Sequence, residues 1–289
     1  MRPINLRFIL IVSLLAIALS QQSCAQNTIS EQLKQLSVQD SLRVDKYLEK
    51  TEGLPIFSPR RGLYIDSALT IVPQNSYLWQ QRAMPLFKQK KYEIAMPYLD
   101  SAVKYNPKRY MDYRAFIKCI FQKKYTEAIK DFKSAQLLNG NSIVMDHSYD
   151  FYMGLCYLQL NKLDSAEYLI KSTIEEERKL RSNDSWIHFL HWFYLGIVLY
   201  EKEDYPTAIE HFDRCLKLYA TFSDAKYYKA ICLDNLEKSK EALTLMIEAE
   251  NDFKKGYTIT EDNAIYEIYP YQINKFYLSA YVEKLKEGN

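Results

Sequence analysis

The sequence predicts an all-α protein built from helical hairpins that follow one another along the chain. Only 7 of its 289 residues are glycine, which favours helices over a turn-rich β fold. Apolar residues make up 48% of the chain, enough to form an extended core. Between residues 192 and 218, apolar residues recur at steps of three and four on both sides of a polar turn at 201–204. This spacing predicts two amphipathic helices that fold back on each other.

The hairpin at 192–218 has small residues where its two helices are expected to cross. Gly196 lies in the first helix and Ala208 in the second, so the two backbones can approach closely. Trp192, Leu195 and Gly196, followed by Ala208 and Phe212, resemble the 34-residue tetratricopeptide repeat. That resemblance implies a right-handed superhelical solenoid of antiparallel helix hairpins, which binds other proteins and is not an enzyme.

The same pattern divides most of the chain into consecutive units. We expect a degenerate repeat at 42–75 and five repeats across 76–256, with units starting at 76, 109, 147, 189 and 223. The spacing slips before the units at 147 and 189. We interpret the charged stretch 175–181 as a solvated extension of a second helix. Pro85 is out of place in a predicted first helix, where it should cause a kink.

Residues 257–289 fall outside the repeat frame. They include a predicted final helix from Tyr271 to Lys286, which would cap the apolar end of the repeat stack. The alternative is that this aromatic tail docks into the protein's own groove.

The N-terminus resembles a secretory signal. Arg2 and Arg7 precede an apolar run at 8–19, and small residues near 25 offer a cleavage site, so we expect a signal peptide at 1–25. The run is too short for a membrane-spanning helix. A polar lead-in would occupy 26–41. Cys24 also suggests lipoprotein-type processing, although Gln21 and Gln22 fit that motif poorly. Two locations therefore stay open for an exported bacterial protein, soluble in the periplasm or attached to a membrane through a lipid on Cys24.

The charge of the mature chain is balanced. Removal of Arg2 and Arg7 from the 38 basic residues leaves 36, against 36 acidic residues. No electrostatic feature therefore favours nucleic acid or an anionic membrane surface as a partner.

The resemblance places the binding surface on the concave face, which is lined by first-helix positions. That face is rich in aromatic residues, a composition suited to gripping a peptide. The predicted groove residues are Tyr77, Tyr110, Tyr113, Phe151, Phe193, Tyr200 and Tyr227. No three consecutive units carry the Lys, Asn and Arg set with which chaperone-binding members of the family clamp a C-terminal carboxylate.

Candidates for other chemistry are few, and we expect no cofactor and no metal site. His188 and His191 lie three residues apart, with Glu203 or Asp204 as conceivable third ligands, but exposed or helix-capping histidines account for them more simply. No phosphate-binding, zinc-protease or hydrolase motif occurs. The cysteines in the repeats, Cys119, Cys156, Cys215 and Cys232, are expected to be buried thiols, and Cys215 with Cys232 is the pair considered for a disulfide.

These observations predict a non-catalytic scaffold or adaptor of the bacterial cell envelope that binds a protein or peptide through its concave aromatic groove. Two alternatives remain. One is a structural scaffold that self-associates through its convex or end surfaces, and the other is a metal-dependent enzyme at His188 and His191. The oligomeric state is not predicted.

Overall fold

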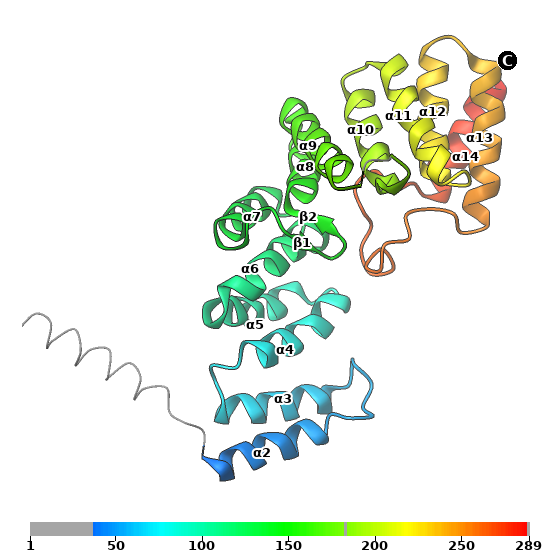
Figure 1. Cartoon of the computed structure of the whole chain (residues 1–289). Coiled ribbons are helices and arrows are strands. Elements are labelled where there is room, and N and C mark those ends of the chain that lie inside the picture. Colours follow the sequence, from blue (N-terminus) through cyan, green and yellow to red (C-terminus); the bar gives the residue numbers. More distant parts are fainter. Residues whose placement is uncertain (1–36, 182–183, 288–289) are drawn as a thin grey trace, which may run out of the picture.

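The computed structural model describes residues 37–181 and 184–287, and its helices form antiparallel hairpins in series (Figure 1). The hairpins pair α2 (Val38–Glu49) with α3 (Pro59–Ile71), α4 (Ser76–Lys88) with α5 (Tyr92–Tyr105), α6 (Pro107–Phe116) with α7 (Tyr125–Asn139), α8 (Tyr149–Gln159) with α9 (Leu163–Arg181), α10 (Phe189–Glu201) with α11 (Tyr205–Leu218), and α12 (Ser223–Asn235) with α13 (Ser239–Lys254). A π-helical turn (Ile117–Phe121) extends α6, and α14 (Lys275–Glu287) follows α13. The prediction of an all-α solenoid of hairpins is confirmed.

The first and last helices differ slightly from their predicted bounds. Helix α2 begins at Val38, before the predicted start at 42, because the Ser37 hydroxyl accepts a hydrogen bond from the Asp40 amide at 3.0 Å. Helix α14 begins at Lys275 instead of Tyr271, and the Asn274 side chain accepts from the Tyr277 amide at 3.1 Å. The predicted signal peptide at 1–25, including Cys24, lies outside the described residues, as does 26–36 of the lead-in.

Small residues allow the paired helices to pack closely. A Cβ atom added to Gly196 would lie 2.6 Å from the Phe212 ring, and one added to Gly154 would lie 2.8 Å from Ile170. Phe212 is completely buried against Gly196, and Ala208 on the same helix is also completely buried. The predicted crossing of α10 and α11 at Gly196 and Ala208 is therefore confirmed.

The extra residues before two of the repeats have structures of their own. Before α8, a short antiparallel hairpin joins β1 (Ile143–Val144) to β2 (His147–Ser148), with Val144 opposite His147. Before α10, helix α9 runs on to Arg181, as predicted, and a 3-10 turn (Asp184–Trp186) follows. The extra residues between repeats thus form short structured segments that precede α8 and α10.

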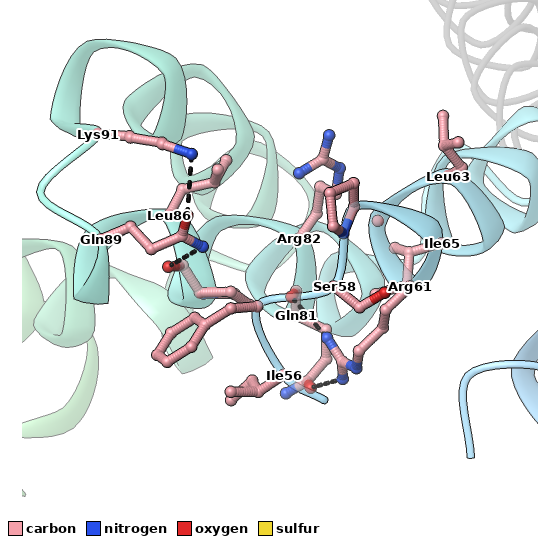
Figure 2. Close-up of a pocket in the computed structure, with 14 residues that line it drawn as sticks. Ile56, Ser58, Arg61, Leu63, Ile65, Gln81, Arg82, Leu86, Gln89 and Lys91 are labelled. Carbon is pink, nitrogen blue, oxygen red and sulfur yellow. Dashed lines mark hydrogen bonds between the residues drawn. The ribbon is translucent and has the colours of Figure 1, made fainter. Parts of the chain in front are cut away.

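Helix α4 continues through Pro85, although proline cannot donate a hydrogen bond to the Gln81 carbonyl oxygen. The Arg61 guanidinium of α3 replaces that donor, since its Nη1 lies 3.5 Å from the Gln81 carbonyl oxygen and its Nη2 lies 3.0 Å from Gln81 Oε1. Figure 2 shows Arg61 reaching Gln81 at the edge of a cavity of about 300 Å³ between α3 and α4. A side chain from the neighbouring hairpin thus satisfies the carbonyl that Pro85 leaves unpaired.

The C-terminal helix caps the stack. Leu278, Val282 and Leu285 of α14 are buried in one cluster with Ala242 and Met246 of α13. The capping role predicted for this helix is therefore confirmed. Within 37–181 and 184–287, no helix combines the length and the apolar character needed to cross a membrane.

Candidate functional site

The candidate site is the inner face of the solenoid, which is formed by the first helices of successive hairpins. The seven predicted groove residues do not share one environment on it. Tyr77 is exposed over 56% of its surface, Tyr113 and Tyr200 are half-buried, and Tyr110 and Tyr227 are buried. Phe151 and Phe193 are completely buried. Among the seven, only Tyr77, Tyr113 and Tyr200 therefore retain surface that a ligand could contact.

The assignment of Phe151 and Phe193 to the groove was wrong. The Phe193 ring packs against Phe212 and Tyr228 with ring centroids 6.1 and 6.0 Å apart, so it joins α10 to the next two helices. The Phe151 ring packs 4.7 Å from His191, between α8 and α10. Both rings fill the interface between adjacent hairpins, where a first-helix residue also contacts the following unit.

A segment of the chain itself covers much of the inner face. Residues 255–274, which connect α13 to α14 and are called the α13–α14 segment here, reach back from the C-terminal hairpins toward α10 and the β1–β2 hairpin (Figure 1). The Tyr194 hydroxyl donates to the Pro270 carbonyl oxygen at 2.9 Å. Lys123 Nζ donates to the Ile268 carbonyl oxygen at 2.5 Å. Side chains of the inner face therefore hold the main chain of this segment.

The far end of the α13–α14 segment reaches the second hairpin. Glu267 accepts a hydrogen bond from the Tyr92 hydroxyl and lies 3.5 Å from Lys90 Nζ. The ammonium of Lys88 lies 4.7 Å from the centre of the Tyr266 ring, within the range of a cation–π contact. The segment thus extends along the inner face from α12 to the end of α4.

The α13–α14 segment is anchored in the core at several points. Ile259 and Tyr269 are each only 2% exposed and belong to the main hydrophobic cluster. Asp224 Oδ1 accepts from the Ile273 amide at 2.9 Å, and burial raises the pKa of that carboxyl group to about 6. Helix α14 thus caps the stack, whereas the segment before it, and not the helix itself, contacts the inner face.

Three histidines meet where the β1–β2 hairpin, α10 and the α13–α14 segment come together. His147 Nδ1 lies 3.1 Å from His191 Nε2, and one ligand atom from each of His147, His188 and His191 lies within 4.8 Å of the others. His191 Nδ1 is 3.0 Å from Glu177 Oε2, and His147 Nε2 is 3.5 Å from Glu261 Oε1. Each buried imidazole therefore has another histidine on one side and a carboxylate on the other.

Burial favours neutral imidazoles in this cluster. It lowers the pKa of His188 to about 4, to which the neighbouring His147 and His191 contribute, and it also lowers the pKa of His191. Burial acts to raise the pKa of Glu177, but the hydrogen bonds and charge interactions with His191 and His188 together outweigh it, so the net pKa is lowered. The neutral forms of His188 and His191 are thus favoured beside the ionised Glu177.

The histidine cluster differs from the sequence prediction in three ways. His191 was expected to be exposed or to cap a helix, but it is buried, with only 2% of its surface exposed. His188 does cap α10, because its side chain accepts a hydrogen bond from the Leu190 amide. Glu203 and Asp204 lie past the far end of α10, roughly 18 Å along the helix from His191. His147 was missed because it is distant in sequence, although it begins one of the slipped repeats.

The first two hairpins leave part of the inner face open. The Tyr113 hydroxyl hydrogen-bonds to the Gln80 side chain, and burial raises the pKa of Tyr113 to about 12. Next to this surface lies the cavity of Figure 2, lined by polar residues that include Arg61, Arg82 and Lys91. Arg82 pairs with Asp66 at 2.8 Å. The amide of Gln80 thus lies beside Tyr113, whereas the basic groups line the cavity between α3 and α4.

All four cysteines among the described residues are free and buried, as expected. The closest pair is Cys119 and Cys156, whose sulfur atoms lie 3.3 Å apart, and not the Cys215 and Cys232 pair considered from the sequence. No disulfide joins the helices in the described part of the chain.

Comparisons with known proteins agree with this geometry. Residues 192–222 match the family model of the tetratricopeptide repeat. A tetratricopeptide repeat protein from Parabacteroides merdae aligns over 85% of this chain and 99% of its own, with a TM-score of 0.59 and 14% identity. The fold is the tetratricopeptide repeat solenoid. Solenoids of this repeat act as protein-interaction scaffolds through extended concave surfaces.

Two further proteins are similar to this chain at low sequence identity. The type IV pilus biogenesis factor PilW aligns over 75% of this chain and 95% of its own, with a TM-score of 0.58 and 14% identity. Stress-induced-phosphoprotein 1 of Caenorhabditis elegans is 21% identical over 203 residues, which are 68% of this chain. The match spans only 58% of that relative's length.

Proposed function

We propose that this protein is a non-catalytic scaffold of the bacterial cell envelope that binds an extended peptide of a partner protein on the open part of its inner face. The observation that carries this proposal is the α13–α14 segment, whose main-chain carbonyl groups are held by Tyr194 and Lys123. An inner face that holds one non-helical polypeptide in this way is suited to hold another beside it.

The position of the segment supports one region of the inner face as the proposed binding site for the partner. The contacts of the segment with this end of the solenoid are at Lys88, Lys90 and Tyr92, around the turn between α4 and α5, so we take the first half of α4 and the adjoining part of α6 as the uncovered part. Tyr77, with 56% exposure, and the half-buried Tyr113 lie on this uncovered part. Tyrosine provides a large apolar ring and a polar hydroxyl at low entropic cost, which suits peptide recognition.

A photo-cross-linking experiment tests this placement. Benzoylphenylalanine is introduced at Tyr77 and, as a matched control, at Tyr168, which is 73% exposed but lies on the second helix α9. After irradiation of native cell envelopes, we expect a discrete partner adduct from position 77 and none from position 168. Adducts from position 168 alone would contradict the proposal, and adducts between two copies of the chain would support self-association instead.

Substitution of the same surface provides a second test. A Tyr77→Ala variant should lose affinity for the partner while its helical circular dichroism stays unchanged, because the Tyr77 side chain is exposed. Retention of the partner would contradict the groove proposal.

The proposed envelope location rests on the N-terminal sequence. Its basic residues, apolar run and Cys24 resemble an export signal. Cell fractionation of the wild type and a Cys24→Ala variant tests the anchor. A shift of the variant from the membrane to the soluble periplasmic fraction would support lipidation of Cys24, and a cytoplasmic location of the wild type would contradict export.

A further inference from the structure

The histidine cluster has an unusual distribution of hydrogen-bond donors and acceptors. If neutral His191 donates from Nδ1 to Glu177, its Nε2 carries a lone pair directed at His147 Nδ1, 3.1 Å away. If neutral His147 donates from Nε2 toward Glu261, its Nδ1 also carries a lone pair. The two lone pairs then face each other. A cation between the two rings, either a shared proton or a metal ion, satisfies both lone pairs together with both carboxylates.

The opposite assignment of protons leaves a different conflict. If His147 donates from Nδ1 to His191 Nε2, the lone pair of His147 Nε2 faces the Glu261 carboxylate. His147 Nε2 is completely buried and has no hydrogen-bond partner with acceptable geometry. A buried polar atom without a partner destabilises the folded protein, and this cost is removed if a further cation binds in the cluster.

We propose that His147, His188 and His191 bind a divalent transition metal ion, with Zn²⁺ as the best match. Imidazole nitrogen is a preferred ligand of Zn²⁺, and two nitrogens bound to one tetrahedral zinc lie about 3.3 Å apart. The observed separation of His147 Nδ1 and His191 Nε2 is 3.1 Å. These two atoms therefore already have the spacing of zinc ligands.

The third ligand comes from His188. Its Nδ1 accepts from the Leu190 amide as the cap of α10, which leaves Nε2 for the metal ion. The ligand atoms of the three rings lie within 4.8 Å of one another, and His188 is the half-buried ring of the three. Glu177 and Glu261 then serve as hydrogen-bond acceptors for the outer nitrogens of His191 and His147, the usual carboxylate support of a zinc-bound histidine.

The proposed site joins segments that are distant in the sequence. His147 belongs to β2, His188 and His191 to the start of α10, and Glu261 to the α13–α14 segment. A bound ion would cross-link the repeat that starts at 147 to the next hairpin. Through Glu261 it would also link that repeat to the α13–α14 segment. Its role is therefore structural, and it differs from peptide binding at Tyr77.

Zinc titration of the chain without a polyhistidine tag tests the site. We expect one equivalent of Zn²⁺ to bind the wild type and to raise its melting temperature. A His188→Asn variant keeps a side chain suited to capping α10 but loses the ligand, so its zinc affinity should fall by more than about tenfold. His211→Gln is the matched control, because His211 is also half-buried but stacks on Trp192 outside the cluster.

A second variant keeps the proposal testable if His188→Asn does not fold. Glu261→Gln removes a supporting carboxylate and should weaken zinc binding roughly 10-fold or more. The proposal is overturned if the wild type binds no zinc at one-to-one stoichiometry. It is also overturned if the folded His188→Asn variant binds zinc as tightly as the wild type, or if His211→Gln loses as much affinity.

Discussion

The Tyr194 hydroxyl donates a hydrogen bond of 2.9 Å to the carbonyl oxygen of Pro270, a residue 76 positions further along the chain. Tyr194 is completely buried in α10, and Pro270 lies in the α13–α14 segment. This bond fixes the segment against the middle of the inner face. It therefore divides that face into a part filled by the chain itself and an open part around Tyr77.

Replacing Tyr194 with phenylalanine should destabilise the protein by about 1–2 kcal/mol, because the buried Pro270 carbonyl oxygen loses its donor while the ring is kept. The free energy of unfolding from urea titration measures this effect. Tyr168→Phe is the control, since Tyr168 is 73% exposed and its stability should be unchanged. Equal stability of Tyr194→Phe and the wild type would show that this bond does not hold the segment.

Gly196→Ala should destabilise the protein by about 1–3 kcal/mol, because the new Cβ would lie 2.6 Å from the completely buried Phe212 ring. Thermal unfolding measures the loss. In contrast, Gly62→Ala in α3 meets only the end of the flexible Arg82 side chain at 3.1 Å. That variant should be as stable as the wild type or slightly more so, and a loss equal to that of Gly196→Ala would refute the packing explanation.

Asp224→Asn should change how stability depends on pH. Burial raises the pKa of folded Asp224 from 3.8 to about 6, so its ionised form opposes folding. This cost is absent below the unfolded pKa and is fully present once the pH exceeds the folded pKa. Relative to the wild type, the variant should therefore gain on the order of 3 kcal/mol between pH 4 and pH 7. A difference that stays constant over this range would contradict the predicted shift.

The four buried cysteines should be unreactive in the folded protein. Burial raises the pKa of the Cys156 and Cys215 thiols, and it raises that of Cys232 to about 12, so few thiolates form. A chain lacking residues 1–25 should show no fast reaction with a thiol reagent when native and four reactive thiols after denaturation without reductant. Two thiols after denaturation would indicate a disulfide, with Cys119 and Cys156 the closest pair at 3.3 Å.

The sequence was sufficient to predict the hairpins because their information is local. The spacing of Gly196, Ala208 and Phe212 specifies one close helix pair, and the same frame applies to the other units. It was also sufficient to predict α14 as a cap, since a repeat stack needs its apolar end covered.

The candidate site depended on contacts that periodicity does not encode. A helical period places Phe193 on the inner side of α10 but does not indicate that Phe222 and Tyr228 cover it. The meeting of His147 with His191, 44 residues apart, likewise depends on the β1–β2 hairpin that precedes α8. Docking of the tail into the groove could likewise be stated only as an alternative, because it also depends on contacts between residues far apart in the sequence.

The α13–α14 segment also affects the order in which the protein can complete its fold. In most repeat arrays each unit contacts only its neighbours, so units can fold as they leave the ribosome. Here Lys123 binds the main chain 145 residues later, and Tyr92 pairs with Glu267, 175 residues later. The central repeats therefore cannot complete their packing until the α13–α14 segment has been synthesised. Part of their aromatic surface stays exposed until then.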